Sequence, residues 1–314
     1  MNRVDTTTQH VLDHLASGPT TGPTMARGLD VSRAAVWKQI ETLRDVGFAI
    51  ESDQAGYRVT GVPEYGAEAV AFGLDAPYSI AYQQSVSSTN EVARSLARDG
   101  ETDLVLLADE QPAGRGRLDR SWVGPSGGIY LSILIRPQLE PVTVPLLTLA
   151  AAVATVESLT AIGIDASIKW PNDVVYHGQK LAGILTEMEG EADRVNWAIV
   201  GIGLNANVDP ALLPDTATSV AAITGETVSR REIVQSLLER FHTHTEHLDT
   251  IIDAWRVHTE TLGRSVRVKI GNETVEGVAE DITASGSLQI RTGEGNLVTV
   301  HAGDCEHLRP HDED

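Results

Sequence analysis

The sequence predicts an α+β fold built from three successive units, and three changes of pattern along the chain support this. Residues 1–62 combine apolar positions at helical spacing with a charge close to zero. From residue 66 to 260, strands and helices interleave without the regular spacing of β-α-β units, which favours a mixed sheet. From residue 262 to 310 the pattern consists of short strands separated by turns, which is typical of a small β-barrel.

The chain is strongly acidic and poor in lysine. Its 314 residues include 24 Lys and Arg against 44 Asp and Glu, a net charge of −20, of which residues 1–62 carry only −1. An acidic surface with few lysines suggests a cytoplasm of high ionic strength, where a large net charge keeps a protein soluble. We therefore expect a halophile as the source. Where lysine is this scarce, each one becomes a candidate for a functional role. The four are Lys38, Lys169, Lys180 and Lys269.

Neither a membrane segment nor a disulfide is expected. The N-terminus lacks a signal-peptide core, and the longest uncharged run, 141–156, is shorter than the ~20 residues that span a bilayer. The single cysteine, Cys305, has no partner for an internal disulfide and is expected to be a small buried side chain. We therefore expect a cytoplasmic protein with no membrane partner.

Residues 1–62 predict a winged helix-turn-helix. A first helix, a second over 24–29 and a third over 33–46 follow one another, the third capped by Ser32, and a hairpin over 50–59 supplies the wing. The third helix would present side chains suited to phosphates and base edges, so operator DNA bound by a homodimer is the expected partner. A small protein-interaction domain is the alternative. The DNA-binding candidates are Ser32, Arg33, Trp37, Lys38 and Gln39.

The central unit begins with a strand-to-helix junction rich in hydrogen-bonding side chains. Ser88 and Glu91 have the spacing of a capping box for a helix over 89–99. A cap accounts for Ser88 but not for the adjacent Thr89 and Asn90. Such a junction can also bind a small polar ligand.

Arginine and glycine alternate in the stretch from Gly114 to Trp122, which lies between two apolar runs. Glycine allows a ligand to approach the backbone closely, and arginine offers planar donors that match carboxylate and phosphate. We therefore expect an anion-binding loop between two strands, with Gln111 at its entrance. An exposed surface loop is the alternative. The loop candidates are Arg115, Gly116 and Arg117.

Two of the four lysines lie at junctions between loops and strands. Lys169 begins the sequence Lys-Trp-Pro-Asn-Asp, and Lys180 begins Lys-Leu-Ala-Gly. The later stretch Gly-Ile-Gly-Leu-Asn, residues 201–205, lacks the third glycine of a dinucleotide fingerprint, so a Rossmann site is disfavoured. A helix over 229–250 then precedes the C-terminal strands.

In order and spacing these motifs resemble those of the biotin–protein ligases. The N-terminal unit is similar to the DNA-binding domain of the bifunctional biotin ligases that also repress the biotin operon, and the resemblance covers nearly the whole chain. It implies a central domain like those of class II synthetases and an SH3-like C-terminal barrel. The motifs that carry it are Ser88-Thr89-Asn90, Gln111 with Gly114-Arg115-Gly116-Arg117, Lys169-Trp170-Pro171-Asn172-Asp173, Lys180-Leu181-Ala182-Gly183 and Gly201-Ile202-Gly203-Leu204-Asn205.

The resemblance implies a two-step reaction on biotin and ATP, with Mg²⁺. Biotinyl-5′-adenylate forms first, and a lysine of biotin carboxyl carrier protein then attacks it. Fixed cations would offset the repulsion between a carboxylate and a polyphosphate. The implied catalytic residues are Arg115, Arg117, Lys169 and Lys180. Biotin would be bound by Ser88, Thr89, Asn90, Gln111, Arg115, Gly116, Arg117 and Lys180. The nucleotide would be bound by Trp122, Asn172, Asp173 and Asn205, with Asp173 as the candidate metal ligand. For Trp122 the alternative, which we favour, is packing within the protein.

One residue departs from the family's pattern, because Asp119 stands where a glycine is common. Aspartate tolerates the left-handed conformation, but it adds a negative charge to the anion loop. This puts loop closure and retention of the intermediate in doubt. Two other functions stay open: ligation of lipoate or octanoate, and ligand sensing by a transcription regulator without catalysis.

Overall fold

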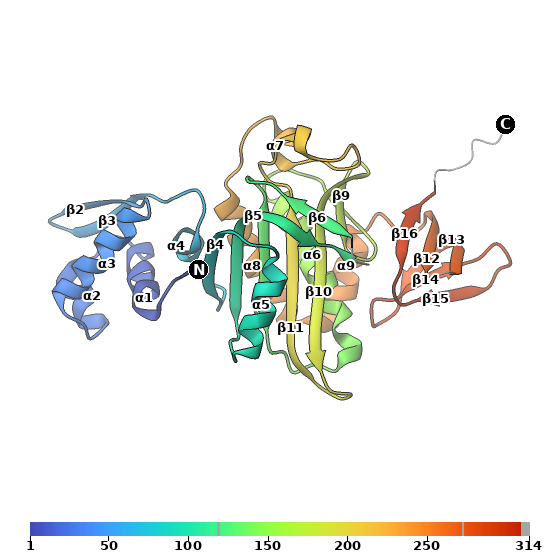
Figure 1. Cartoon of the computed structure of the whole chain (residues 1–314), viewed down its shortest axis with the longest axis horizontal. Helices are drawn as coiled ribbons and strands as arrows, with labels where there is room; N and C mark the ends of the chain where they lie inside the picture. Colours follow the sequence, from blue (N-terminus) through green and yellow to red (C-terminus); the bar gives the residue numbers. More distant parts are fainter. Residues whose placement is uncertain (118–119, 272, 309–314) are drawn as a thin grey trace.

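The computed structural model describes residues 1–117, 120–271 and 273–308, and it arranges them as three units along one axis (Figure 1). The N-terminal helices lie at one end, a large sheet with its helices occupies the centre, and a small β-domain lies at the other end. This is the α+β class that the sequence predicts.

The N-terminal unit is a winged helix-turn-helix. Its helices are α1 (Thr6–Ala16), α2 (Gly22–Gly28) and α3 (Arg33–Asp45), and strands β2 (Ala49–Asp53) and β3 (Gly56–Gly61) form the wing. The Ser32 hydroxyl accepts a hydrogen bond from the Ala35 amide at 3.1 Å, so the predicted cap of the third helix is confirmed. Leu12, Ile40 and Leu43 are fully buried and hold the helices together.

The first strand was not predicted. Strand β1 (Asn2–Arg3) pairs antiparallel with β4 (Ser79–Ser85) at the edge of the central sheet. The Asn2 amide also donates to the buried carboxylate of Glu68 at 2.8 and 3.0 Å. Residues 2–3 therefore belong structurally to the central sheet, and a division at residue 62 does not separate the two units cleanly.

The central sheet is mixed, with strand order β1-β4-β5-β7-β11-β10-β9-β8 and β6 paired with β5. Only β4 and β5 run parallel among the described strands. The remaining strands are β5 (Leu104–Arg115), β6 (Ser121–Gly124), β7 (Ile129–Ile135), β8 (Ser167–Lys169), β9 (Asp173–Tyr176), β10 (Gln179–Gly190) and β11 (Val195–Leu204).

Helices cover both faces of this sheet (Figure 1). Along β5, Leu104 and Leu106 face α5, while Val105 and Leu107 face the core beneath α6, as the two-residue period of a strand requires. The helices are α4 (Ala67–Ala71), α5 (Thr89–Arg98), α6 (Pro145–Thr160), α7 (Val220–Thr224), α8 (Arg230–Glu246) and α9 (Ile251–His258), with the 3₁₀ turns η2 (Pro141–Thr143), η3 (Pro210–Leu212) and η4 (Leu248–Thr250).

Two expectations about this unit are wrong in detail. The arginine-rich stretch is not all loop, because β5 continues to Arg115 and β6 begins at Ser121. The helix expected over 229–250 ends at Glu246, and η4 and α9 follow it.

Helical residues 141–160 are together long and apolar enough to cross a membrane by length and composition alone. Most of them are buried in the core of the fold, which accounts for their apolar composition.

The C-terminal unit is the small all-β domain that the sequence predicts. Its five antiparallel strands follow the order β15-β14-β13-β12-β16 and enclose Val266, Val268 and Ile290. The strands are β12 (Ser265–Ile270), β13 (Glu273–Ile282), β14 (Leu288–Arg291), β15 (Leu297–Val300) and β16 (Asp304–His307).

Hydrogen bonds attach this unit to β8 and to the loop that follows it. The Trp170 amide donates to the Thr261 hydroxyl at 2.9 Å, and the Trp170 indole donates to the Gly286 carbonyl at 3.0 Å. The His307 ring lies 3.2 Å from Glu260, and the Ser167 hydroxyl donates to the same carboxylate at 3.0 Å. These hydrogen bonds hold the pKa of Glu260 below its usual 4.5, against the opposing effect of burial.

We expect Glu260→Gln to lower the free energy of unfolding by about 1–2 kcal/mol near neutral pH, because it removes hydrogen bonds to a charged group. A depressed carboxyl pKa contributes stability that is complete above pH 4.5 and is lost as the pH falls through the folded value. The difference between wild type and variant, measured by urea denaturation, should therefore shrink as the pH falls below 4.5. The exposed substitution Glu226→Gln is the control, and a difference that grows in acid would contradict the assignment.

Candidate active site

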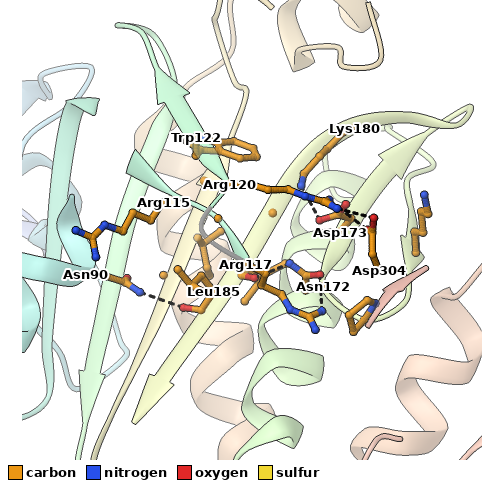
Figure 2. A pocket seen from close by; sticks show the side chains of 18 of the residues that line it. Asn90, Arg115, Arg117, Arg120, Trp122, Asn172, Asp173, Lys180, Leu185 and Asp304 are labelled. Carbon is orange, nitrogen blue, oxygen red and sulfur yellow. Dashed lines mark hydrogen bonds and ion pairs between the residues drawn. The ribbon is translucent and has the colours of Figure 1, made fainter. Parts of the chain in front are cut away.

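One cavity of about 230 Å³ lies over the ends of β10 and β11, beneath the ribbon formed by β5 and β6 (Figure 2). Its far wall comes from the C-terminal unit, through Gly303, Asp304 and Cys305. Of the residues predicted for the ligase site, the following line this cavity: Ser88, Thr89, Asn90, Gln111, Arg115, Gly116, Arg117, Trp122, Lys169, Asn172, Asp173 and Lys180.

The start of α5 does not carry the predicted capping box. Ser88 occupies the N-cap position, but its side chain makes no capping hydrogen bond. Instead the Gln111 side-chain oxygen, Oε1, accepts from the Thr89 backbone amide at 2.7 Å and from the Thr89 hydroxyl at 2.9 Å. The Glu91 carboxylate accepts from the Ser87 hydroxyl at 3.0 Å. Ser88 is thus a buried hydroxyl at the cavity wall that does not serve as a cap.

Asn90 fastens α5 to the sheet. Its amide nitrogen donates to the Leu185 carbonyl at 3.2 Å and to Glu187 at 2.9 Å, and its oxygen accepts from the Ser132 hydroxyl at 2.6 Å (Figure 2). A Cβ at Gly201 would collide with this amide. The first glycine of the Gly-Ile-Gly stretch therefore makes room for Asn90.

The indole of Trp122 lies on two further glycines. A Cβ at Gly203 would come within 2.8 Å of the ring, and one at Gly183 within 3.1 Å. Lys180 Nζ is 5.2 Å from the centre of the ring, within the range of a cation–π interaction. The glycines of β10 and β11 are thus required by packing against a side chain, which explains their spacing without a dinucleotide.

Lys180 is aimed at the cavity by an irregularity in β10. Pairing between β10 and β9 shifts register between Lys180 and Ala182, and such a bulge redirects a side chain. Lys180 Nζ forms an ion pair with Asp173 at 2.7 Å (Figure 2). That Asp173 oxygen, Oδ1, is buried and makes no well-aligned hydrogen bond among the described residues.

The loop arginines also have partners. Arg117 donates to the Asn172 side chain at 3.0 Å, and burial lowers the pKa of its guanidinium, which nevertheless stays charged. Arg115 pairs with Glu91 at 2.6 Å and extends away from Lys180 and Asp173 (Figure 2). The cavity wall thus carries several cations, but the Arg115 guanidinium points towards Glu91 and away from the other cations.

Sequence reasoning missed the contribution of the C-terminal unit. Arg120 makes a bidentate contact with Asp304, at 2.5 and 3.2 Å (Figure 2). Arg120 lies in the arginine-rich stretch and could have been chosen, whereas nothing in the sequence near Asp304 indicates a site. Cys305 is buried as expected, and burial raises the pKa of its thiol to about 11, so it is a neutral side chain near pH 7.

Comparison with known proteins fits this geometry. Residues 82–205 match the biotin/lipoate A/B protein ligase family, residues 261–308 match the biotin protein ligase C terminal domain, and residues 7–58 match an HTH domain. The bifunctional ligase/repressor BirA of Bacillus spizizenii is 37% identical over 302 residues, which cover 91% of this chain and 93% of that protein. This chain belongs to the bifunctional biotin ligase/repressor family.

Other members of the family agree with the assignment. A biotin–[acetyl-CoA-carboxylase] ligase of Mycobacterium tuberculosis is 32% identical over 72% of this chain and 87% of its own length. A solved structure of the biotin protein ligase from Aquifex aeolicus, in complex with biotin and ATP, superposes with a TM-score of 0.63 at 28% identity. That match covers 73% of this chain and 98% of the Aquifex chain.

Two predicted residues do not lie at the sites expected for them: Asn205 is not at the cavity, and Gln39 is not on the outer face of α3. Asn205 is buried, donates to the Thr218 carbonyl at 3.0 Å and does not line the cavity, because the chain turns there towards α7. Gln39 does not face outward on α3, because its side chain accepts a hydrogen bond from Thr8 on α1 at 3.1 Å. Asp119 lies outside the described residues.

The other DNA-binding candidates lie on the free side of α3. Arg33, Trp37 and Lys38 are exposed, and the Trp37 ring is 57% exposed, which is unusual for its size. Ser32 is also exposed, but its hydroxyl is engaged in the cap.

We expect Gly203→Ala to lower the free energy of unfolding by about 1–3 kcal/mol, because the added methyl overlaps the Trp122 ring. The control is Gly293→Ala, where a Cβ meets no atom within 4 Å. Urea denaturation monitored by circular dichroism measures both. Equal stability of Gly203→Ala and wild type would show that Trp122 does not need this glycine.

Proposed function

We propose that this chain joins biotin to ATP and transfers the biotinyl group to a lysine of biotin carboxyl carrier protein. In the first step a biotin carboxylate oxygen bonds to the α-phosphorus, and the bond to pyrophosphate breaks. In the second step the lysine amine bonds to the acyl carbon, and AMP leaves. The observation that carries the proposal is one cavity lined by two lysine and three arginine side chains together with polar groups from α5 and β5.

The charges of the site suit the first step. Two anions must come within bonding distance, and fixed cations lower the cost of that approach in a site shielded from water. Lys180 provides a compact charge, and Arg117 provides a planar fork beside it. In our proposal, substrate oxygens replace Asp173 and Asn172 as the partners of these cations. Arg115 leaves Glu91 and turns inward when the loop closes.

The biotin pocket would be formed at the start of α5. Ser88 has a hydroxyl at the cavity wall, and Thr89 and Gln111 are held rigidly by their mutual hydrogen bonds. Asn90 would act by holding α5 in place, because its amide is fully used by protein groups. Gly116 leaves the loop backbone accessible, and Lys169 adds a further cation at the opposite wall.

The residues present fit the magnesium ion that accompanies ATP. Mg²⁺ binds oxygen ligands and is commonly held by one or two carboxylates together with substrate phosphates. Asp173 Oδ1 is buried in the cavity, where it pairs with the Lys180 ammonium at 2.7 Å. It could hold such an ion once substrate oxygens take its place beside Lys180. Among the described residues no cluster of three acidic, His or Cys side chains is placed to hold a metal alone. When bound, the ion would withdraw charge from the phosphates.

The direct test mixes the chain with biotin, ATP and Mg²⁺ and measures biotinyl-5′-adenylate and acceptor labelling by mass spectrometry. We expect Lys180→Gln to slow adenylate formation about 10²–10³-fold, because it removes a charge aimed at the reacting anions. Arg115→Ala should speed loss of the adenylate from the site. Arg98→Ala, an exposed substitution on α5, is the control.

The same experiment separates the alternatives. Adenylate formation with lipoate or octanoate but not with biotin would indicate the related acyl ligases. Binding of biotin without any acceptor labelling would indicate a regulator that has no catalytic activity. Unchanged adenylate formation in Lys180→Gln would remove that lysine from its proposed role.

We also propose that the chain represses transcription as a homodimer on operator DNA, in a cytoplasm of high ionic strength. The exposed Arg33, Trp37 and Lys38 on α3 support DNA binding, and the acidic, lysine-poor surface supports the high-salt habitat. We expect Arg33→Ala with Lys38→Ala to weaken binding to a duplex selected from a random pool at least tenfold, and to leave labelling of the acceptor unchanged. Retained DNA binding would contradict this role for α3.

A further inference from the structure

Arg230, the first residue of α8, is an almost buried cation outside the active-site cavity. Its side chain is 11% exposed, and it contacts three segments that are far apart in the sequence. Burial of its charge is unfavourable, but hydrogen bonds to Glu64 and Asp109 outweigh this and raise its pKa. The guanidinium and Asp109 are largely buried, whereas the Glu64 side chain is 51% exposed, so the contact with Asp109 is the better shielded from water.

The two sides of the guanidinium bind different segments. Nε and Nη2 donate to both oxygens of Glu64, at 2.8 and 2.6 Å. Nη1 donates to Asp109 at 2.5 Å and to the Gly128 carbonyl at 3.1 Å. The face of the guanidinium lies 4.2 Å from the centre of the Tyr65 ring. A planar fork can bridge two carboxylates in this way, whereas an ammonium cannot reproduce the geometry.

Asp109 lies where the two-stranded ribbon of β5 and β6, which we call the substrate ribbon, leaves the central sheet. Strand β5 pairs with β7 up to Ala108, and from Gln111 onward it pairs with β6 instead. Asp109 also accepts from the Ser126 hydroxyl at 2.5 Å, so β5 and the turn between β6 and β7 are joined at this carboxylate, at the base of the ribbon. The ribbon beyond it carries Arg115 at its end.

Glu64 and Tyr65 belong to the connection between the wing and α4. The wing ends at Gly61 and α4 begins at Ala67, so this connection is one of two, with the residues between β1 and α1, that join the DNA-binding unit to the central unit. The Tyr65 hydroxyl is buried and makes no hydrogen bond within the described residues. The Tyr65 ring packs against Tyr82 and against the Arg230 guanidinium, so Arg230 supplies a charged contact to a segment that apolar packing also holds.

We infer that Arg230 is a positioning residue that couples the substrate ribbon to the connection with the DNA-binding unit. The guanidinium is shared between Asp109 and Glu64, so a movement of the ribbon base as the loop closes over the adenylate changes its hold on Glu64. Ligand in the active site thereby alters the order of residues 61–66. This inference rests on the proposed function, because the adenylate is the ligand that closes the ribbon.

Hydrogen–deuterium exchange of the full chain, with and without biotin, ATP and Mg²⁺, tests the inference. Mass spectrometry of the same samples reports whether the adenylate has formed. In the wild type we expect ligand to change the exchange rate of amides in residues 61–66 at least threefold. Glu64→Gln should reduce this response by half or more, while acceptor labelling stays within twofold of wild type. Arg230→Lys keeps the positive charge but loses the planar guanidinium, and it should reduce the response to the same extent.

The matched control is Glu232→Gln, in the same turn of α8, where the carboxylate is exposed and, in the part of the chain that the structure describes, binds Arg231 alone. Its response should equal that of the wild type. Formation of the adenylate without any change in residues 61–66, or an unaltered response in Glu64→Gln, would overturn the inference. If no adenylate forms, the proposed function fails, and the inference fails with it.

Discussion

The active site depends on keeping several cations close together before any anion has arrived. Like charges at such distances repel, so each cation needs a partner that holds it in position and can be displaced. Lys180 has Asp173, Arg117 has Asn172, and these partners lie on adjoining residues of one motif after β8. Because the partners come from β9 and the loop before it, the geometry of the site is determined by the register of β8, β9 and β10.

A second constraint is steric. The sheet beneath the cavity must accept side chains that approach it closely, and only glycine leaves that space. Asn90 lies against Gly201, and Trp122 lies against Gly203 and Gly183. The same residues therefore fasten α5 and the substrate ribbon to the sheet, which places Ser88 and Gln111 on one side of the cavity and Lys180 on the other.

Local chemistry was predictable from the sequence, and long-range contact was not. The cap at Ser32, the helical faces and the strands of the C-terminal unit follow from patterns within about ten residues. Strand β1 is too short to show any period, and Asp304 meets Arg120 across 184 positions. Asn205 and Gln39 were misplaced because a motif fixes the residue type but not the direction of its side chain.

The role of the active-site cations is tested most directly by a crystal structure of this chain with a non-hydrolysable analogue of biotinyl-5′-adenylate. We predict that Lys180 and both loop arginines will lie within hydrogen-bond distance of the acyl phosphate, with Arg115 released from Glu91. An analogue bound while Lys180 stays on Asp173, Arg117 on Asn172 and Arg115 on Glu91 would contradict the account.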